Sequence, residues 1–303
     1  NAEDLEAATK GKDFDEFTTQ IISFMKEILA DVEDSKELKE ELPKAIEHFN
    51  TQLKYHLNTE FDPRKQILKD DENDWNNKHY GDGNVIGPDP EEALHGTHVA
   101  GIVAAVRDNG IGMNGVANAA IIMPVRAVPD GDEYDKDIAL AIRYAVDNGA
   151  KVINTSFGKA YSPHKEWVYE AIKYAASKDV LIVNAAGNDS EDIDVKETFP
   201  NDEVDGKEIA DNFLTVGALN YQYNEKLVAS FSNYGKRNVD VFAPGVKIYA
   251  TTPGNKYEFL QGTSMASPEV AGLAALLRSY FPTLTAAQVK EVIMKSGIRV
   301  PLK

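Results

Sequence analysis

Cysteine is absent from all 303 residues. The chain therefore forms no disulfide, performs no thiol catalysis and holds no zinc through cysteine. Long apolar runs are also absent: no stretch approaches the roughly 20 residues that cross a bilayer, and none resembles a signal peptide. Because the chain begins with Asn1 rather than Met, we expect that an upstream segment has been removed.

Basic residues are too few to balance the acidic ones, and the net charge is −17. Residues 1–94 carry 24 acidic against 11 basic side chains, a balance of −13, which leaves −4 for the other 209 residues. Nucleic acid is an unsuitable partner for such a chain, because binding phosphates requires clustered Lys and Arg. The acidic N-terminal third is interpreted as a solvated surface.

Residues 1–70 have a helical pattern. Asp13 and Glu16 have the spacing of a capping box, and two apolar stripes follow, the second with Pro43 at its start or at a kink. The stripes comprise Phe14, Phe17, Ile21, Phe24, Met25 and Ile28, and then Leu38, Leu42, Ile46, Phe49, Leu53 and Leu57. We expect a helical hairpin whose stripes pack in a core rather than bind a cofactor. Residues 71–94, rich in Asp, Asn, Gly and Pro, are expected to form a loop or linker.

Residues 95–303 alternate strand-like and helical segments. The apolar runs expected to form strands are 121–128, 152–157, 180–186, 213–219 and 239–243. The expected helices are 96–106, 137–148, 165–178, 264–280 and 286–296, the last of them capped by Thr285 with Gln288. Continuous apolar strands separated by helices predict an α/β domain with a parallel sheet covered on both faces.

Ser264 and His95 are candidates for nucleophilic catalysis. A serine hydroxyl needs an imidazole to take its proton and donors to hold the developing oxyanion. Ser264 lies at an expected helix N-terminus, where backbone N–H groups point outward, and Gly262 leaves room for a substrate. Serine at a helix start is more often only a cap. His98, three residues after His95, is expected to be packed and hydrogen-bonded rather than to bind a metal.

Four motifs give these candidates a context. His95-Gly-Thr-His-Val-Ala-Gly and Gly262-Thr-Ser-Met-Ala-Ser-Pro resemble the histidine and serine boxes of the subtilisin-like serine proteases, the subtilases of peptidase family S8. Residues 152–158 resemble the substrate-binding strand of that family, and residues 183–188 resemble the segment that ends in its oxyanion-hole asparagine. The resemblance covers about residues 95–300 and implies a three-layer α/β fold with a mainly parallel sheet, here with an N-terminal helical insertion.

The resemblance implies serine endopeptidase chemistry through an acyl-enzyme. His95 is implied as the general base for Ser264, and Asn188 as a donor to the oxyanion. The residues implied to bind a polypeptide substrate are Ser156, Phe157, Gly158, Ala185, Ala186 and Gly187. No cofactor is needed for this chemistry; structural calcium is compatible with the resemblance, but no ligand loop is recognisable and no metal ligand is assigned. The resemblance also implies a secreted or cell-envelope location, and it is compatible with a propeptide or another upstream segment.

The aspartate of the family's triad is missing. Its Asp-Ser-Gly or Asp-Thr-Gly setting occurs nowhere in the 303 residues, and Asp4, Asp82 and Asp89 lie in polar sequence that makes them weak substitutes. We therefore expect a fragment that starts after the aspartate strand and is severely impaired alone. The alternative is a non-catalytic pseudoprotease or scaffold whose helical insertion recruits a partner. An α/β-hydrolase esterase is excluded, because Ala266 stands at the second glycine of Gly-x-Ser-x-Gly and the histidine precedes the serine.

The last expectation concerns the residue type that the first specificity pocket prefers in a substrate. Acidic residues cluster directly after Asn188, in a stretch that borders the first specificity pocket of the family, so they could favour Lys or Arg there. An ordinary solvated acidic loop is the stronger interpretation. The residues concerned are Asp189, Glu191, Asp192, Asp194 and Glu197.

Overall fold

A computed structural model of the chain describes residues 9–11, 43, 46, 49–117, 119–129 and 131–300. The chain divides into two compact units, Asn1–Ile67 and Leu68–Lys303. Each unit is described by itself.

Among the described residues of the first unit lies the short π-helix η1 (Gln52–His56), and a second one, η2 (Arg64–Leu68), ends one residue past the boundary. Four apolar residues of the second stripe are 52% to 68% exposed, so the expected core packing is not seen among the described residues. They are Ile46, Phe49, Leu53 and Leu57. The capping box at Asp13, the whole first stripe, and Leu38 and Leu42 lie outside the described residues.

The second unit is built on a four-stranded parallel sheet. Its strands are β1 (Val152–Thr155), β2 (Leu181–Ala185), β5 (Phe213–Leu219) and β6 (Val241–Pro244), in the order β1-β2-β5-β6. In β2 all five residues are buried. A strand buried on both faces has a continuous apolar sequence instead of an alternating one, which is why it could be recognised from the sequence.

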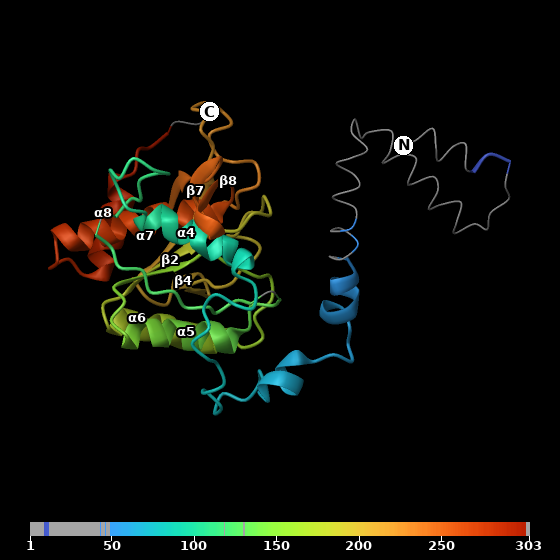
Figure 1. The fold of residues 1–303 in the computed structure, drawn as a ribbon. Helices are drawn as coiled ribbons and strands as arrows, with labels where there is room; N and C mark the ends of the chain where they lie inside the picture. Colours follow the sequence, from blue (N-terminus) through green and yellow to red (C-terminus); the bar gives the residue numbers. More distant parts are fainter. Residues whose placement is uncertain are drawn as a thin grey trace. The chain divides into compact units, whose positions relative to one another are not determined.

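Helices cover both faces of this sheet (Figure 1). On one face lie α5 (Asp135–Asp147) and α6 (Lys165–Ser177), packed on Ile182 and Phe213. On the other lie α7 (Thr263–Tyr280) and α8 (Ala286–Ser296), packed on Val183 and Leu214. The neighbours Ile182 and Val183 thus serve opposite layers, as the two-residue repeat of a strand requires. The predicted three-layer α/β class is confirmed, and the predicted capping box of Thr285 and Gln288 is present.

One predicted strand does not form. Residues 121–128 pair with no neighbour among the described residues, and Ile121 is 96% exposed. A strand exists only through hydrogen bonds to an adjacent strand, and the apolar sequence does not supply one. On its other side β1 is likewise unpaired within the described chain, with β2 as its single neighbour in the sheet.

A hairpin that the sequence did not predict joins the sheet layer to the serine box. It consists of β7 (Ile248–Thr252) and β8 (Lys256–Leu260), and β8 ends four residues before Ser264. Helix α4 (Leu94–Ala104) packs closely against β7: a Cβ on Gly101 would lie 2.1 Å from Thr251 Oγ1. A second, two-residue hairpin pairs β3 (Glu203–Val204) with β4 (Lys207–Glu208).

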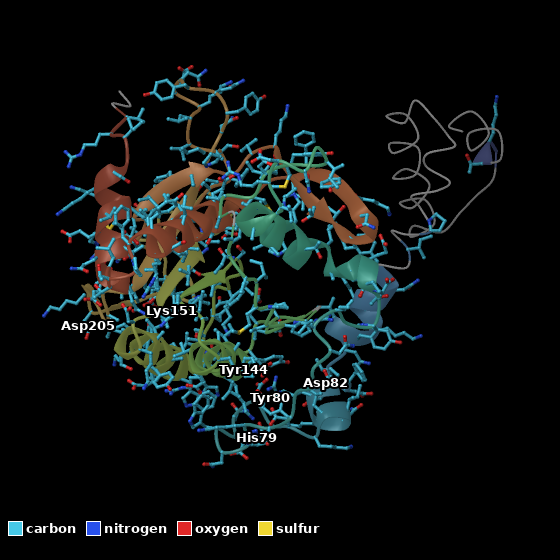
Figure 2. All side chains as sticks on the ribbon, turned by 60° about the vertical axis from the view of Figure 1, so that its left-hand side comes forward. His79, Tyr80, Asp82, Tyr144, Lys151 and Asp205 are labelled. Carbon is cyan, nitrogen blue, oxygen red and sulfur yellow. The ribbon has the colours of Figure 1, made fainter. Side chains whose placement is uncertain are left out.

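The segment from Leu68 to α4 belongs to the second unit and contains one short 3-10 helix, η3 (Pro90–Ala93). Its start is fastened to α5, and Figure 2 shows His79 and Tyr80 beside the layer that carries Tyr144. The Tyr80 hydroxyl donates to Asp137, and Lys136 Nζ lies 2.6 Å from Asp70 Oδ1. Trp75 stacks on Trp167 of α6 with ring centroids 4.8 Å apart.

Candidate active site

The candidate residues gather where the parallel strands end. Ser156–Gly158 follow β1, Ala186–Asn188 follow β2, and Ser264 is the second residue of α7. Because the carboxyl ends of parallel strands share one edge of the sheet, these three segments are adjacent there. Hydrogen bonds connect all three: the Ser156 hydroxyl donates to the Ser264 carbonyl at 2.9 Å, and Gly187 N donates to Thr263 Oγ1 at 3.1 Å.

The Ser264 hydroxyl donates to the carbonyl of Ser156 at 3.2 Å. Among the described residues it makes no hydrogen bond to His95. In this state the hydroxyl is held on the candidate substrate strand, and it must rotate before an imidazole can take its proton.

Two donors converge on one point beside Ser264. Asn188 Oδ1 accepts from Thr263 N at 2.8 Å and from Thr263 Oγ1 at 3.0 Å, which turns the amide nitrogen of Asn188 outward. A Cβ placed on Gly262 would lie 3.6 Å from Asn188 Nδ2 and 3.7 Å from both Asn188 Oδ1 and Ser264 N, so both nitrogens lie on this side of Gly262. Neither nitrogen has an acceptor among the described residues. The two N–H groups are therefore free to hold an oxyanion.

Gly262 keeps that point open and also shapes the backbone. Its φ of 147° and ψ of 163° belong to a region that essentially only glycine occupies. Thr263, which orients Asn188, was not identified from the sequence as a site residue. Its position between Gly262 and Ser264 is the only sequence signal that could have indicated this role.

His95 is exposed at the second position of α4. Desolvation by the surrounding protein lowers the pKa of its imidazole, and the neighbouring His98 lowers it further. A lowered pKa keeps His95 neutral near pH 7, as a general base must be. No described carboxylate is hydrogen-bonded to it, so among the described residues nothing orients the ring or stabilises an imidazolium.

The substitutes for the missing aspartate are engaged elsewhere. Asp82 accepts the backbone N–H of Asn84 at 2.8 Å, and Asp89 caps η3 through Glu91 N at 2.9 Å. Asp4 lies outside the described residues. His98 is fully buried with Nε2 3.2 Å from the Glu258 carbonyl, which makes it a packing residue between α4 and β8.

The acidic residues after Asn188 are mostly paired. Asp194 accepts three backbone N–H groups, from Lys236, Arg237 and Asn238, at 2.8 to 3.1 Å. Burial acts to raise the pKa of Asp194, but these hydrogen bonds outweigh it and the pKa is lowered. The other pairs are Glu191 with Lys196 and Glu197 with Lys165. These three acidic residues are thus engaged in hydrogen bonds or ion pairs, and a preference of the neighbouring pocket for Lys or Arg stays a prediction.

A second cluster of charges surrounds Lys290 on α8. Its Nζ lies 3.1 Å from Glu208 and 3.5 Å from Asp240. Asp202 borders the same cluster, and its Oδ2 is buried without a partner in the described part of the chain. Burial raises the pKa of Asp202 to about 7. No sequence pattern indicated this group, because its members come from separate elements.

The fold and the candidate site indicate a hydrolase with a serine nucleophile. Comparison with known proteins identifies the family. The model of the subtilase family matches residues 15–298, and the chain belongs to that family. A thermophilic serine proteinase of Bacillus sp. (strain AK1) is 47% identical over 186 residues, which are 61% of this chain and 42% of that protein. The cell wall-associated protease of Bacillus subtilis (strain 168) is 42% identical over 204 residues, 67% of this chain and 21% of that protein.

Solved structures agree. A protease from Pseudoalteromonas arctica PAMC 21717 superposes with a TM-score of 0.60 at 32% identity, covering 68% of this chain and 65% of that one. A cold-adapted subtilisin-like serine proteinase gives 0.56 at 30% identity, covering 67% of each chain. The chain thus spans less than half the length of the two relatives named first. Within the described residues, no helix is both long and apolar enough to cross a membrane.

Proposed function

We propose that the protein is a serine endopeptidase that cleaves polypeptides through an acyl-enzyme. Ser264 attacks the scissile carbonyl, His95 takes its proton and returns it to the leaving amine, and Asn188 with the Ser264 N–H holds the oxyanion. The observation that carries the proposal is that the Asn188 amide and Ser264 N lie on the same side of Gly262, and that neither nitrogen has an acceptor among the described residues. A pseudoprotease would have no reason to retain such an arrangement.

Substrate binding is proposed to use the edge Ser156–Gly158, with Ala185–Gly187 as the opposite wall. Gly158 has no side chain, and a Cβ at this position would lie 3.3 Å from the Phe199 carbonyl oxygen. The backbone of Phe199 therefore lies close to this end of the edge. An extended substrate that adds to a strand edge is bound through its main chain, which tolerates many sequences.

The triad acid is proposed to come from a segment outside these 303 residues. Two features support this: within the described residues β1 has a neighbouring strand on one side only, and residues 121–128, with Ile121 96% exposed, pair with no strand. A further parallel strand that pairs there would satisfy these backbone groups and could carry an aspartate to His95. Without it, turnover should fall by roughly 10⁴-fold.

Metal is given no role in this proposal. The subtilase reaction needs no cofactor. Among the described residues no group of three or more His, Asp or Glu side chains is placed to hold a metal ion. Location is proposed to be secreted or at the cell envelope, by similarity to the cell wall-associated protease.

The test compares hydrolysis of a fluorogenic peptide by residues 1–303, by Ser264→Ala, and by the chain extended upstream through an Asp-Ser/Thr-Gly strand. In the subtilisin triad, loss of the acid costs about 3 × 10⁴ and loss of the serine about 2 × 10⁶, so the wild-type chain should exceed Ser264→Ala by roughly 60-fold. The extended chain should gain about 10⁴-fold. Equal rates for all three proteins would support the scaffold alternative instead.

A further inference from the structure

Lys159 directly follows the proposed substrate edge Ser156–Gly158, and its backbone is fixed. Its N–H donates to the Phe199 carbonyl and its carbonyl accepts from Phe199 N, both at 2.9 Å. This reciprocal pair joins the end of the edge to the backbone of Phe199. The backbone on one side of Gly158 therefore cannot move without disturbing Phe199.

The side chain of Lys159 reaches a different part of the unit. Nζ lies 2.7 Å from Asp135 Oδ1 at the start of α5 and also donates to the carbonyl of Glu133. The two side chains are 15% and 2% exposed. Water screens such a pair little, so removal of one charge strands the other in a desolvated site.

Asp135 ties further parts of the chain to the same point. Its carboxylate accepts the Ser162 hydroxyl at 2.6 Å and the backbone N–H of His164 at 2.8 Å. The turn that follows the substrate edge is thereby fastened to the first residue of α5. The residues that donate to Asp135, namely Lys159, Ser162 and His164, all follow Gly158 in the sequence.

We propose that Lys159 is a positioning residue for the acyl side of the substrate, an inference that rests on the proposed function. An edge that receives an added strand must already be extended and held, because each main-chain hydrogen bond contributes only a small net free energy and is lost if the edge moves. Lys159 holds this edge from two sides, through its backbone to Phe199 and through its ammonium to Asp135. Longer peptides, which pair along more of the edge, depend on it; a single bound residue does not.

The experiment measures equilibrium binding to the full 303-residue chain, so that catalysis is not needed. The probes are dye-labelled Ala-Ala-Ala-Leu and dye-labelled Leu, both with a free carboxyl group, followed by fluorescence anisotropy. The variants are Lys159→Met and Lys159→Arg, with Lys290→Met as the matched control. Lys290 is a comparably buried lysine, 8% exposed, whose carboxylate partners lie outside the substrate edge.

Wild type should bind the tetrapeptide at least tenfold more tightly than Leu, as two extra main-chain hydrogen bonds would give. Lys159→Met should lose about tenfold for the tetrapeptide and nothing for Leu, Lys159→Arg should recover most of the loss, and Lys290→Met should bind as wild type. If Lys159→Met does not fold, Asp135→Asn replaces it, with the same expected loss.

Two results would overturn the inference. One is a folded Lys159→Met that retains the full advantage of the tetrapeptide, and the other is an equal loss in Lys290→Met. Failure of the proposed function is distinct from both: wild type itself would then bind the tetrapeptide no better than Leu.

Discussion

The buried ion pair between Lys136 and Asp70 gives the sharpest test of the second unit. Both side chains are 0% exposed and Nζ lies 2.6 Å from Oδ1. The ammonium also donates to the Asp71 carbonyl at 3.0 Å and lies 4.6 Å from the ring centroid of Tyr80, while Asn77 donates to Asp70 at 2.6 Å. Lys136→Met would remove the counter-charge that lies 2.6 Å from this buried carboxylate.

The expected cost of Lys136→Met is about 3–5 kcal/mol, because removal of one partner of a buried ion pair is strongly destabilising. For a unit of this size that lowers Tm by on the order of 10 °C. Lys173→Met is the control: its pair with Glu170 is 47% and 62% exposed and should contribute no more than about 1 kcal/mol. The double variant Lys136→Met/Asp70→Asn should recover much of the loss, since an amide still accepts from Asn77 and bears no charge.

Tryptophan fluorescence during denaturant unfolding is the appropriate assay. The chain has two tryptophans, Trp75 and Trp167, which stack on each other within the second unit. The signal therefore reports on that unit and on the very segment that Asp70 fastens. The reasoning is refuted if Lys136→Met is no more destabilising than Lys173→Met, or if the double variant is as unstable as the single one.

Three further predictions concern the site and the pH dependence. Gly262→Ala should cost about 1–3 kcal/mol through its backbone conformation and should also abolish turnover by crowding the oxyanion position, whereas Gly297→Ala, at a φ of −59°, should be neutral in the same thermal and kinetic assays. Asn188→Leu should lower kcat roughly 100- to 1,000-fold in the upstream-extended chain with little change in KM, and an unchanged kcat would remove Asn188 from the oxyanion site. The pKa of Asp202 is about 7 in the folded state against an ordinary value of 3.8, so the folded state binds the proton more tightly than the unfolded state. As the pH rises from about 4 to about 7, the free energy of unfolding of the wild type should therefore fall relative to that of Asp202→Asn, and then level off. Parallel pH profiles of the two proteins would contradict this.

Local patterns in the sequence predicted most of the layer architecture. The predicted strand 213–219 and helix 286–296 have the bounds found in the structure, because a doubly buried strand and a capped helix are encoded by neighbouring residues. Residues 121–128 show where prediction from local sequence fails: the apolar run is present, but no strand pairs with it among the described residues. The hairpin of β7 and β8 escaped prediction because its exposed and half-buried residues do not alternate cleanly.

The candidate site was predictable as a set of residues but not as a set of contacts. Ser264, Asn188 and Ser156 could be selected by their motifs, and the structure brings them together. The partners that hold them are remote in sequence: Thr263 lies 75 residues from Asn188, and Asp135 lies 24 positions before Lys159. Ordinary side chains such as Lys159 have no motif, so only the fold assigns them a role.

The pKa of His95 depends on the charges that lie next to it and not on the net charge of the protein. The protein carries a net charge of −17, yet desolvation and His98 together lower the pKa of His95, and no carboxylate in the described part of the chain is placed to raise it. Charges more than about 8 Å away are largely screened at physiological ionic strength, so surface acids cannot replace a hydrogen-bonded aspartate. One carboxylate delivered to His95 should therefore raise its pKa and restore orientation, while any number of acids added to the surface should do neither. A histidine titration followed by NMR, with and without the upstream strand, separates these two effects directly.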